Sequence, residues 1–323
     1  MCSSDLDRGI GGIIGVVTER RTPEQLFELL TRHVGAWSPQ RQQSHGFDLL
    51  FGDDDRLKAD RRYHARRVLV GQHILGQQVA QHSSPMVLMK GLEVAQLYPN
   101  QLQRPFRDLD VLVRDARVRW DGLVAQGYWQ NPKRRLDIDH HHLPALADPT
   151  GMLGVELHHR PNVPGWATIP AELIFDTAQP SRTGVEGVLR PRDDVHALLM
   201  AMHCWKGGFT RQRDLFDAML LAAHSDEGVE AMAASLGLRR FWRVTTRLAE
   251  SVLFADDSKR VPMQRWIIPT ANGIHQRARS QIVAPYLAVN PLRTSVTHAR
   301  AWRAGRRLRS GSINRGDHEP AGS

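Results

Sequence analysis

Cysteine is almost absent from this chain: among its 323 residues, only Cys2 and Cys204 carry thiols. Two cysteines so far apart argue against a disulfide framework and offer too few thiolates for a structural zinc site. Long apolar runs are missing as well. No stretch approaches the roughly 20 apolar residues that a membrane-spanning helix needs, and residues 1–17 lack the basic flank and long apolar core of a secretion signal. We therefore expect a cytoplasmic protein with no membrane partner.

Aromatic residues are also scarce, at 7% of the chain, whereas basic residues are abundant and give a net charge of +9. A basic chain can bind nucleic acid through its phosphates, but single strands are usually held by aromatic side chains interleaved with basic ones. That interleaving is not found here, and much of the excess charge lies in residues 293–315. Nucleic acid is therefore an alternative partner that the sequence does not favour.

The most informative stretch runs from residue 86 to residue 113. Residues 86–89 form a short apolar run typical of a buried strand, Lys90 and Gly91 end it, and residues 92–98 have the composition of a short helix. A basic loop then leads to a second predicted strand, 108–113, which begins Asp-Leu-Asp. Residues two apart in a strand face the same side, so Asp108 and Asp110 project together. Carboxylates held that close repel each other unless a cation such as Mg²⁺ lies between them.

These residues belong to a longer pattern. Lys-Gly is followed by Tyr98-Pro99 and then by Arg-x-x-x-Asp-x-Asp-x-Leu-Val, beginning at Arg104. The stretch resembles the polymerase-beta-type nucleotidyltransferase superfamily and, more narrowly, a bacterial family of uncharacterised nucleotidyltransferases. It departs from the wider superfamily at Leu92, where Ser or Gly commonly follows the glycine, and in a longer spacing between Gly91 and Asp108.

The resemblance implies a third metal carboxylate on a strand beside Asp-x-Asp. Residues 154–159 read as one strand of a hairpin, and Glu156 is the candidate. We therefore expect Asp108, Asp110 and Glu156 to be catalytic and to hold two Mg²⁺ ions, with Mn²⁺ as a substitute. The residues expected to contact the nucleoside triphosphate are Lys90, Gly91, Arg104, Arg107 and His158.

Two of these residues have a structural alternative. Arg104 either contacts phosphate oxygens or forms an ion pair with an acidic side chain. His158 either orients a carboxylate or the substrate, or is simply a hydrogen-bonded histidine. The same choice applies to a group in the C-terminal half, which either closes the site or pairs between helices: His196, His203, Arg213 and Asp214.

A second acidic and histidine-rich stretch covers residues 137–142, with the sequence Asp-Ile-Asp-His-His-His. Neighbouring residues of a strand alternate faces, so at most His140 and His142 could share one ion. No cysteine or further ligand is spaced to complete a closed zinc site. We interpret this strand as a neighbour of the site and not as the ion's main ligand.

We predict an α+β fold in which a small mixed sheet carries flanking helices and is followed by a C-terminal helical domain. The helical expectation rests on a capped start at Thr22-Pro23, a long basic pattern over 57–81, and amphipathic patterns from residue 193 onward. The predicted segments are a flexible N-terminus (1–20), an N-terminal helical segment (21–85), the nucleotidyltransferase core (86–160), a helical domain (161–290) and a basic disordered tail (291–323).

The function implied is metal-dependent transfer of a nucleoside monophosphate from a nucleoside triphosphate such as ATP to a hydroxyl-bearing acceptor, with release of pyrophosphate. The acceptor, a small molecule or a protein, is not identified by the sequence. The alternatives are a catalytically inactive binding or regulatory protein with the same fold, which Leu92 favours, and a nucleic-acid-binding protein, which the net charge favours.

Overall fold

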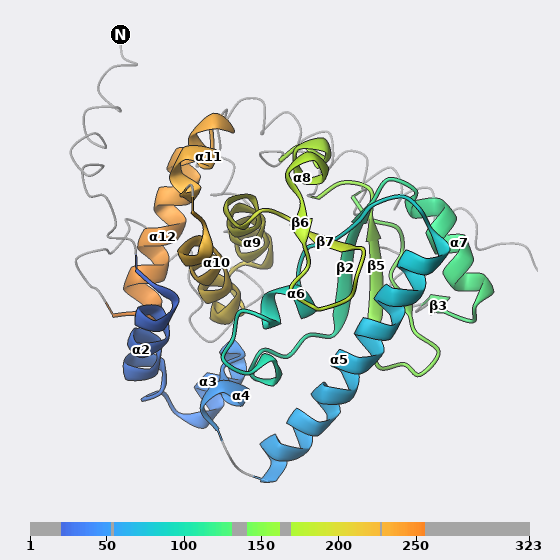
Figure 1. The fold of residues 1–323 in the computed structure, drawn as a ribbon. Helices are drawn as coiled ribbons and strands as arrows, with labels where there is room; N and C mark the ends of the chain where they lie inside the picture. Colours follow the sequence, from blue (N-terminus) through green and yellow to red (C-terminus); the bar gives the residue numbers. More distant parts are fainter. Residues whose placement is uncertain (1–20, 53–54, 131–140, 162–168, 227, 256–323) are drawn as a thin grey trace, which may run out of the picture.

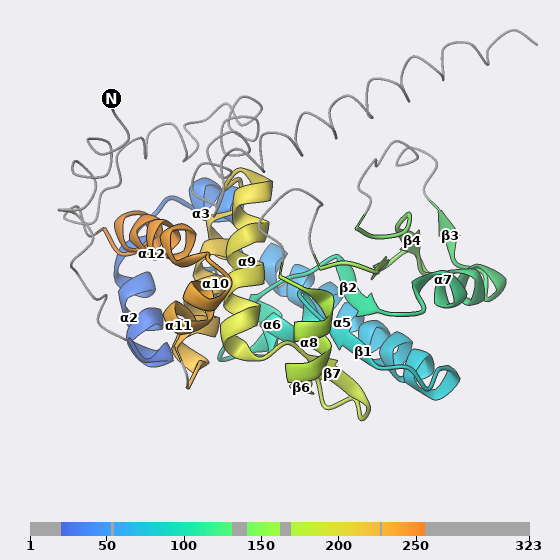
Figure 2. The same cartoon turned by 90° about the horizontal axis from the view of Figure 1, so that it is seen from above.

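A computed structural model describes residues 21–52, 55–130, 141–161, 169–226 and 228–255. The expectations for residues 1–20 and 137–140, for the last part of the predicted helical domain (256–290) and for the tail 291–323 concern parts of the chain outside this description. Figures 1 and 2 show two parts side by side: a sheet with α5 and α7, and a group of helices formed by α2 and α9 to α12. The predicted α+β class is confirmed.

The described residues form one seven-stranded mixed sheet with the order β3-β4-β5-β2-β1-β7-β6. At its centre β2 pairs antiparallel with β1 and parallel with β5, while β1 pairs parallel with β7. The strands are β1 Met86–Leu88, β2 Asp108–Val113, β3 Trp129–Gln130, β4 Leu146–Ala147, β5 Gly154–His158, β6 Gln179–Pro180 and β7 Val188–Arg190.

Helices precede, interrupt and follow the strands. Thr22 caps the first described helix with a capping box and Pro23 at its first turn, as its sequence predicts. The helices are α2 Pro23–Val34, α3 Pro39–His45, α4 Asp48–Phe51, α5 Asp55–Gln81, α6 Leu92–Ala95, α7 Ala116–Ala125, α8 Ala171–Thr177, α9 Asp193–Gly207, α10 Gln212–His224, α11 Val229–Ser235 and α12 Arg239–Leu253.

The two faces of the central strands belong to different cores. Leu109 and Val111 of β2 pack in one apolar cluster with Val68 and Leu75 of α5. Leu112, on the other face, belongs to the cluster formed by the helical group. Because alternate residues of a strand face opposite sides, Asp108 and Asp110 lie on the face of Leu112, toward the helical group.

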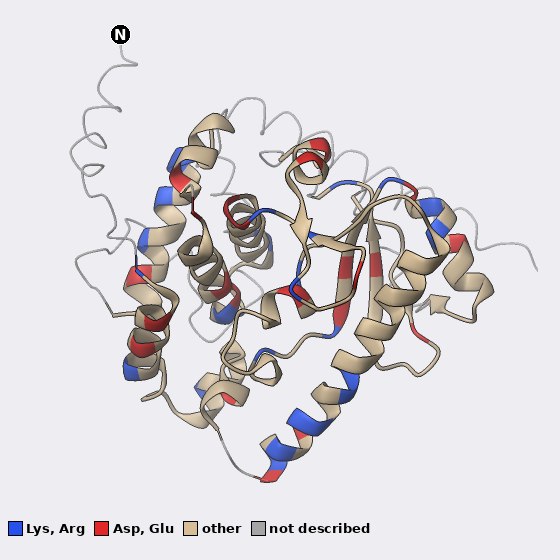
Figure 3. Cartoon of the chain, in the orientation of Figure 1, with Lys and Arg blue, Asp and Glu red and all other residues tan. Residues whose placement is uncertain are grey.

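The basic residues of α5 gather in its first half, as Figure 3 shows, whereas acidic residues lie on β2 and β5. Arg62 and Arg66 are exposed, and Arg67 donates to the carbonyl oxygens of Met152 and Phe106. The helix therefore has a solvated basic side and a side packed on the sheet. None of the described helices is both long and apolar enough to cross a membrane.

The chain after residue 161 differs from the expectation of a purely helical region. Strands β6 and β7 return to the sheet, where Val188 and Leu189 pair with Met86 and Val87 of β1. These strands span two and three residues and include Pro180, so they are too short to show an alternating pattern. Their pairing with the buried β1 defines them, and the helical run starts only at α9.

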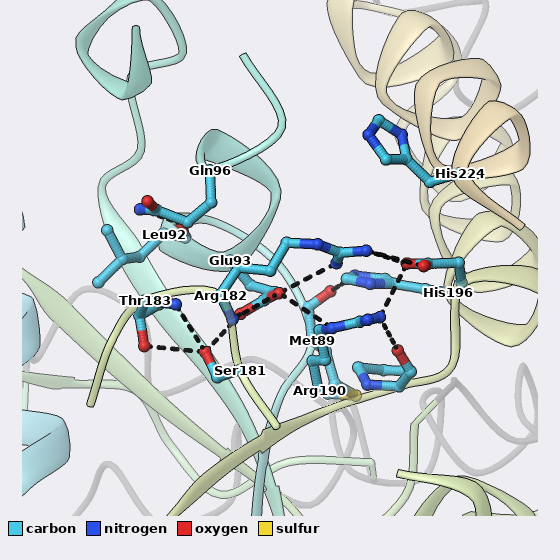
Figure 4. Close-up of polar contacts among 12 residues, drawn as sticks. Met89, Leu92, Glu93, Gln96, Ser181, Arg182, Thr183, Arg190, His196 and His224 are labelled. Carbon is cyan, nitrogen blue, oxygen red and sulfur yellow. Dashed lines mark hydrogen bonds and ion pairs between the residues drawn. The ribbon is translucent and has the colours of Figure 1, made fainter. Parts of the chain in front are cut away.

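A buried ion network ties α6 to this returning hairpin and to α9 (Figure 4). Glu93, with no exposed side-chain surface, accepts hydrogen bonds from Ser181 Oγ at 2.5 Å and from Arg182 Nη1 at 3.2 Å. Asp193 accepts from Arg182 Nη2 at 2.7 Å and from Arg190 Nη1 at 2.8 Å. Two acids thus neutralise two arginines, which is the condition under which buried charges are tolerated.

Candidate active site

Parallel pairing of β2 with β5 brings the predicted carboxylates together. In this register Asp110 lies opposite Glu156, Asp108 lies opposite Gly154, and Leu112 lies opposite His158. Residues directly opposite on neighbouring strands have close Cβ atoms and project to the same face. The main-chain register therefore places the carboxylates of Asp110 and Glu156 side by side.

Asp110 is the centre of the polar contacts. Its Oδ1 lies 2.5 Å from Lys90 Nζ and 3.2 Å from His158 Nε2. The Nε2 of His158 also lies 3.8 Å from Glu156 Oε2. One ligand atom from each of Asp110, Glu156 and His158 lies within 4.8 Å of the others. The predicted Lys90, Asp110, Glu156 and His158 thus form one cluster.

The acidic groups of this cluster have different electrostatic environments. Burial, reinforced by the charges of Asp110 and Glu156, raises the pKa of Asp108 to about 6. Burial acts in the same direction on Asp110, but Lys90 and His158 outweigh it and hold the pKa of Asp110 well below its ordinary value. Burial also acts to raise the pKa of Glu156, but hydrogen bonding from His158, together with the charges of Lys90 and His142, outweighs it and lowers that pKa. The site holds negative charge that Lys90 and His158 only partly compensate.

Gly91 has a steric role in placing Asp108. Its φ of 59° and ψ of −112° suit glycine alone. A Cβ at this position would lie 2.7 Å from the carbonyl oxygen of Asp108. The absence of a side chain lets the turn after β1 lie directly against the start of β2. Leu92, the residue after it, has no exposed surface and packs near Gly71 of α5.

The two arginines of the preceding loop lie in different environments. Arg104 is 5% exposed, and its guanidinium donates to Asp217 Oδ2 from Nε at 3.1 Å and from Nη2 at 2.7 Å. Its Nη1 donates to the carbonyl oxygen of Gly91 at 3.3 Å. Arg107 is exposed, and its carbonyl oxygen accepts from Gly154 N at 2.9 Å. Of the two roles expected for Arg104, phosphate contact or an ion pair with an acidic side chain, the structure shows the ion pair. Arg107 is open to solvent.

The described part of the histidine-rich stretch, His141 and His142, lies beside the site. The rings of His141 and His142 have centroids 5.2 and 5.1 Å from that of His158. The Nε2 of His142 lies 4.0 Å from Glu156 Oε2, and His142 forms an isolated bridge with His158. His140 lies outside the described residues.

Helix α9 also contacts this group of residues, through His141. Lys206 Nζ lies 3.3 Å from His141 Nε2, and His203, whose side chain is 38% exposed, lies 3.7 Å from Asp214 Oδ2. Sequence reasoning missed Lys206. Lys206 could have been found from its position relative to His203. The two residues are three positions apart and share one face of the helix, and they are polar on a helix whose other residues are largely buried. His196 is fully buried and bonds to the carbonyl oxygen of Met89, which makes it a contact between helix and sheet.

The donor set fits a divalent cation. Strand carboxylates are the oxygen ligands that Mg²⁺ and Mn²⁺ use, and imidazole adds a nitrogen donor. Excess negative charge around Asp108, Asp110 and Glu156, with an ammonium group already in contact with Asp110, is the environment that a cation stabilises.

A comparison with models of protein families finds a match. The model of a family described as uncharacterised nucleotidyltransferases matches residues 55–254, which include every residue of the cluster. No curated protein and no solved structure matches the chain.

Proposed function

Because the chain belongs to this family of uncharacterised nucleotidyltransferases, we propose that it transfers a nucleoside monophosphate from a nucleoside triphosphate to an acceptor hydroxyl. The acceptor oxygen forms a bond to the α-phosphorus, the bond from that phosphorus to the bridging oxygen breaks, and pyrophosphate leaves. The hydroxyl proton is released. The observation that carries the proposal is the register of β2 and β5, which sets Asp110 beside Glu156 with Asp108 on the same face.

Asp108, Asp110 and Glu156 would hold the divalent cations, with His158 beside them. Bound cations lower the pKa of an attacking hydroxyl and neutralise charge on the triphosphate. The carboxylates serve as ligands on a rigid sheet, so their spacing is set before substrate arrives. A divalent cation, Mg²⁺ or Mn²⁺, is the expected ion, and ATP is a representative substrate.

Positive charge for the phosphate oxygens comes from Lys90 and Arg107. The side chain of Lys90 is 19% exposed and next to Asp110, and Arg107 is exposed one residue before Asp108. Arginine can contact phosphate oxygens with two nitrogen atoms at once. Arg104, paired with Asp217, instead supports the Gly91 turn.

One observation supports the alternative of a catalytically inactive binding protein. Leu92 is packed in the core beside Gly71, so its side chain supplies no hydroxyl to a phosphate, as a serine there could. At this turn, Lys90 and the main chain around Gly91 are the groups left to contact a phosphate.

The test is a screen with the full chain. Each nucleoside triphosphate, labelled in the α-phosphate, would be incubated with Mg²⁺ or Mn²⁺ and with small-molecule or protein fractions of a cell extract. We expect label transfer with pyrophosphate release from wild type and none from the Asp108→Asn/Asp110→Asn variant. Asp121→Asn, at an exposed acid on α7, is the matched control and should behave as wild type. Metal-dependent nucleotide binding seen as a rise in Tm, without transfer to any fraction, would favour the inactive alternative.

A further inference from the structure

The imidazole of His158 lies beside the two carboxylates, Asp110 and Glu156, that face each other across β2 and β5. The residue is 1% exposed. It comes two residues after Glu156 on β5, so both side chains leave the same face of the strand. Its Nε2 is directed at the acids, at 3.2 Å from Asp110 Oδ1 and 3.8 Å from Glu156 Oε2.

These separations match those between ligands of one metal ion. At a metal–ligand distance of about 2.1 Å, adjacent ligands of an octahedral ion are about 3.0 Å apart and opposite ligands about 4.2 Å. The separations from His158 Nε2 to Asp110 and Glu156 fall within that span, and all three ligand atoms lie within 4.8 Å of one another. Small side-chain shifts are enough for all three to contact one ion.

The surroundings of the ring fix its direction. It contacts the ring of His141 edge-on and the ring of His142 in a tilted arrangement, and its main chain lies within β5, where it pairs with Leu112 of β2. A buried ring held on two sides has little freedom to turn its Nε2 away from the acids. An ion that binds to Asp110 and Glu156 therefore meets a nitrogen donor already in place.

We propose that His158 Nε2 is a ligand of the catalytic-site ion, and that this nitrogen makes the site prefer a divalent first-row transition ion to Mg²⁺. Magnesium binds oxygen ligands and retains water, whereas imidazole is a favourable ligand for transition ions. Mn²⁺ is the weakest binder of that series, so it is the most stringent probe. The inference rests on the proposed function only in taking Asp110 and Glu156 as the ion's ligands.

The competing interpretation is that His158 only donates a hydrogen bond to Asp110. The two interpretations predict different results for the His158→Gln variant, because a glutamine amide can keep a hydrogen bond but supplies no imidazole nitrogen. His142→Gln is the matched control. It removes a neighbouring ring whose Nε2 is 4.0 Å from Glu156 and leaves His158 in place.

The experiment uses the full chain and Mn²⁺ alone. Electron paramagnetic resonance of free Mn²⁺ gives its Kd, competition with Mg²⁺ gives the preference, and electron spin-echo envelope modulation detects a nitrogen bound to the ion. We expect nitrogen modulation in wild type and in His142→Gln, and its loss in His158→Gln. We also expect wild type to prefer Mn²⁺ over Mg²⁺ by about tenfold or more, and His158→Gln to lose most of that preference.

The inference is overturned if wild type binds Mn²⁺ without nitrogen modulation. It is also overturned if the modulation persists in His158→Gln and disappears in His142→Gln. Either result leaves the proposed function standing. The wild-type measurement needs no variant, so a misfolded His158→Gln does not obstruct the test. Mn²⁺ bound through His158 by a protein that transfers no nucleotide supports the inference and removes the proposed function. A chain that binds no Mn²⁺ contradicts both.

Discussion

Arg104 and Asp217, which are 113 residues apart in the chain, form a buried ion pair that connects the loop before β2 to α10. Asp217 has no exposed side-chain surface and also accepts a hydrogen bond from the Tyr98 hydroxyl at 2.8 Å. Arg104 in turn donates to the carbonyl oxygen of Gly91. Asp217, a residue of the helical group, thereby holds in place the Gly91 turn, which sets the positions of Lys90 and Asp108.

Asp217→Asn should strongly destabilise the fold. It leaves the Arg104 guanidinium buried without its charge partner, a change that typically costs about 3–5 kcal/mol. Urea unfolding followed by circular dichroism measures the difference. Glu28→Gln is the control, because Glu28 and Arg32 form an ion pair whose side chains are 69% and 70% exposed, and such pairs contribute about 0–1 kcal/mol. Equal small losses in both variants would show that the buried pair is not needed for stability.

Gly91→Ala should lower both stability and metal-dependent nucleotide binding. The substitution brings a Cβ to 2.7 Å from the Asp108 carbonyl oxygen at a φ of 59°, and a strained conformation of this kind costs about 1–3 kcal/mol before the clash is relieved. Gly122→Ala has no neighbour within 4 Å of its Cβ and should stabilise α7 by about 0.5–1 kcal/mol. Tm values of the two variants, with and without Mn²⁺ and ATP, check this. A Gly91→Ala protein as stable as wild type would mean that the turn adapts freely.

His196 should make the fold sensitive to acid. Burial, with Arg182 and Arg190 nearby, lowers the pKa of His196 to about 3. The unfolded chain takes up a proton near pH 6.5 while the native ring stays neutral, so stability declines as pH falls from about 6.5 toward 3. Between pH 7 and pH 4, His196→Gln should lose less unfolding free energy than wild type, by about 3 kcal/mol. Urea unfolding at each pH measures this, with the exposed His73→Gln expected to follow wild type. A His196→Gln curve parallel to wild type would contradict the assignment.

Asp110→Asn should leave the fold intact, because the charges of Asp108 and Glu156 still act on Lys90, and should slow nucleotide transfer by about a thousandfold or more. The change keeps the side chain's size and removes a charge that holds the cation, and a thousandfold corresponds to about 4 kcal/mol of lost transition-state stabilisation. Single-turnover rates with any acceptor found in the screen provide the measurement.

Glu156→Gln should slow nucleotide transfer to a similar extent if Glu156 is a ligand. Combining Asp108→Asn with Asp110→Asn should cost far less than the product of the two effects, because the ligands act as a unit. Near-normal turnover of Asp110→Asn would place the metal site elsewhere.

The local parts of this architecture can be predicted from the sequence. Period-two alternation places Asp108 and Asp110 on one face, and the Thr22 capping box and the Gly208 left-handed cap mark helix ends that a sequence shows directly. These features depend on residues a few positions apart. The hairpin of β4 and β5 is similarly local.

The remaining features depend on pairings across long stretches of chain. Nothing near Arg104 in the sequence identifies Asp217 as its partner, and nothing near residue 188 indicates that β7 pairs with β1. The approach of Lys206 to His141 is fixed by how α9 packs on the sheet. Such contacts come from tertiary packing, which a pattern within one segment does not encode.

The alternation of β5 also restricts where the chain can change in length. Glu156 and His158 face the ion site, and Val155 and Leu157 face the apolar cluster under α5. Inserting or deleting one residue inside the strand would exchange these faces, burying a carboxylate and an imidazole in the core. The exposed turn at residues 149–151 can absorb a length change because it lies beyond the last main-chain pair of the hairpin, Asp148 with Leu153. Relatives with longer or shorter hairpins should therefore differ in that turn and keep β5 itself at constant length.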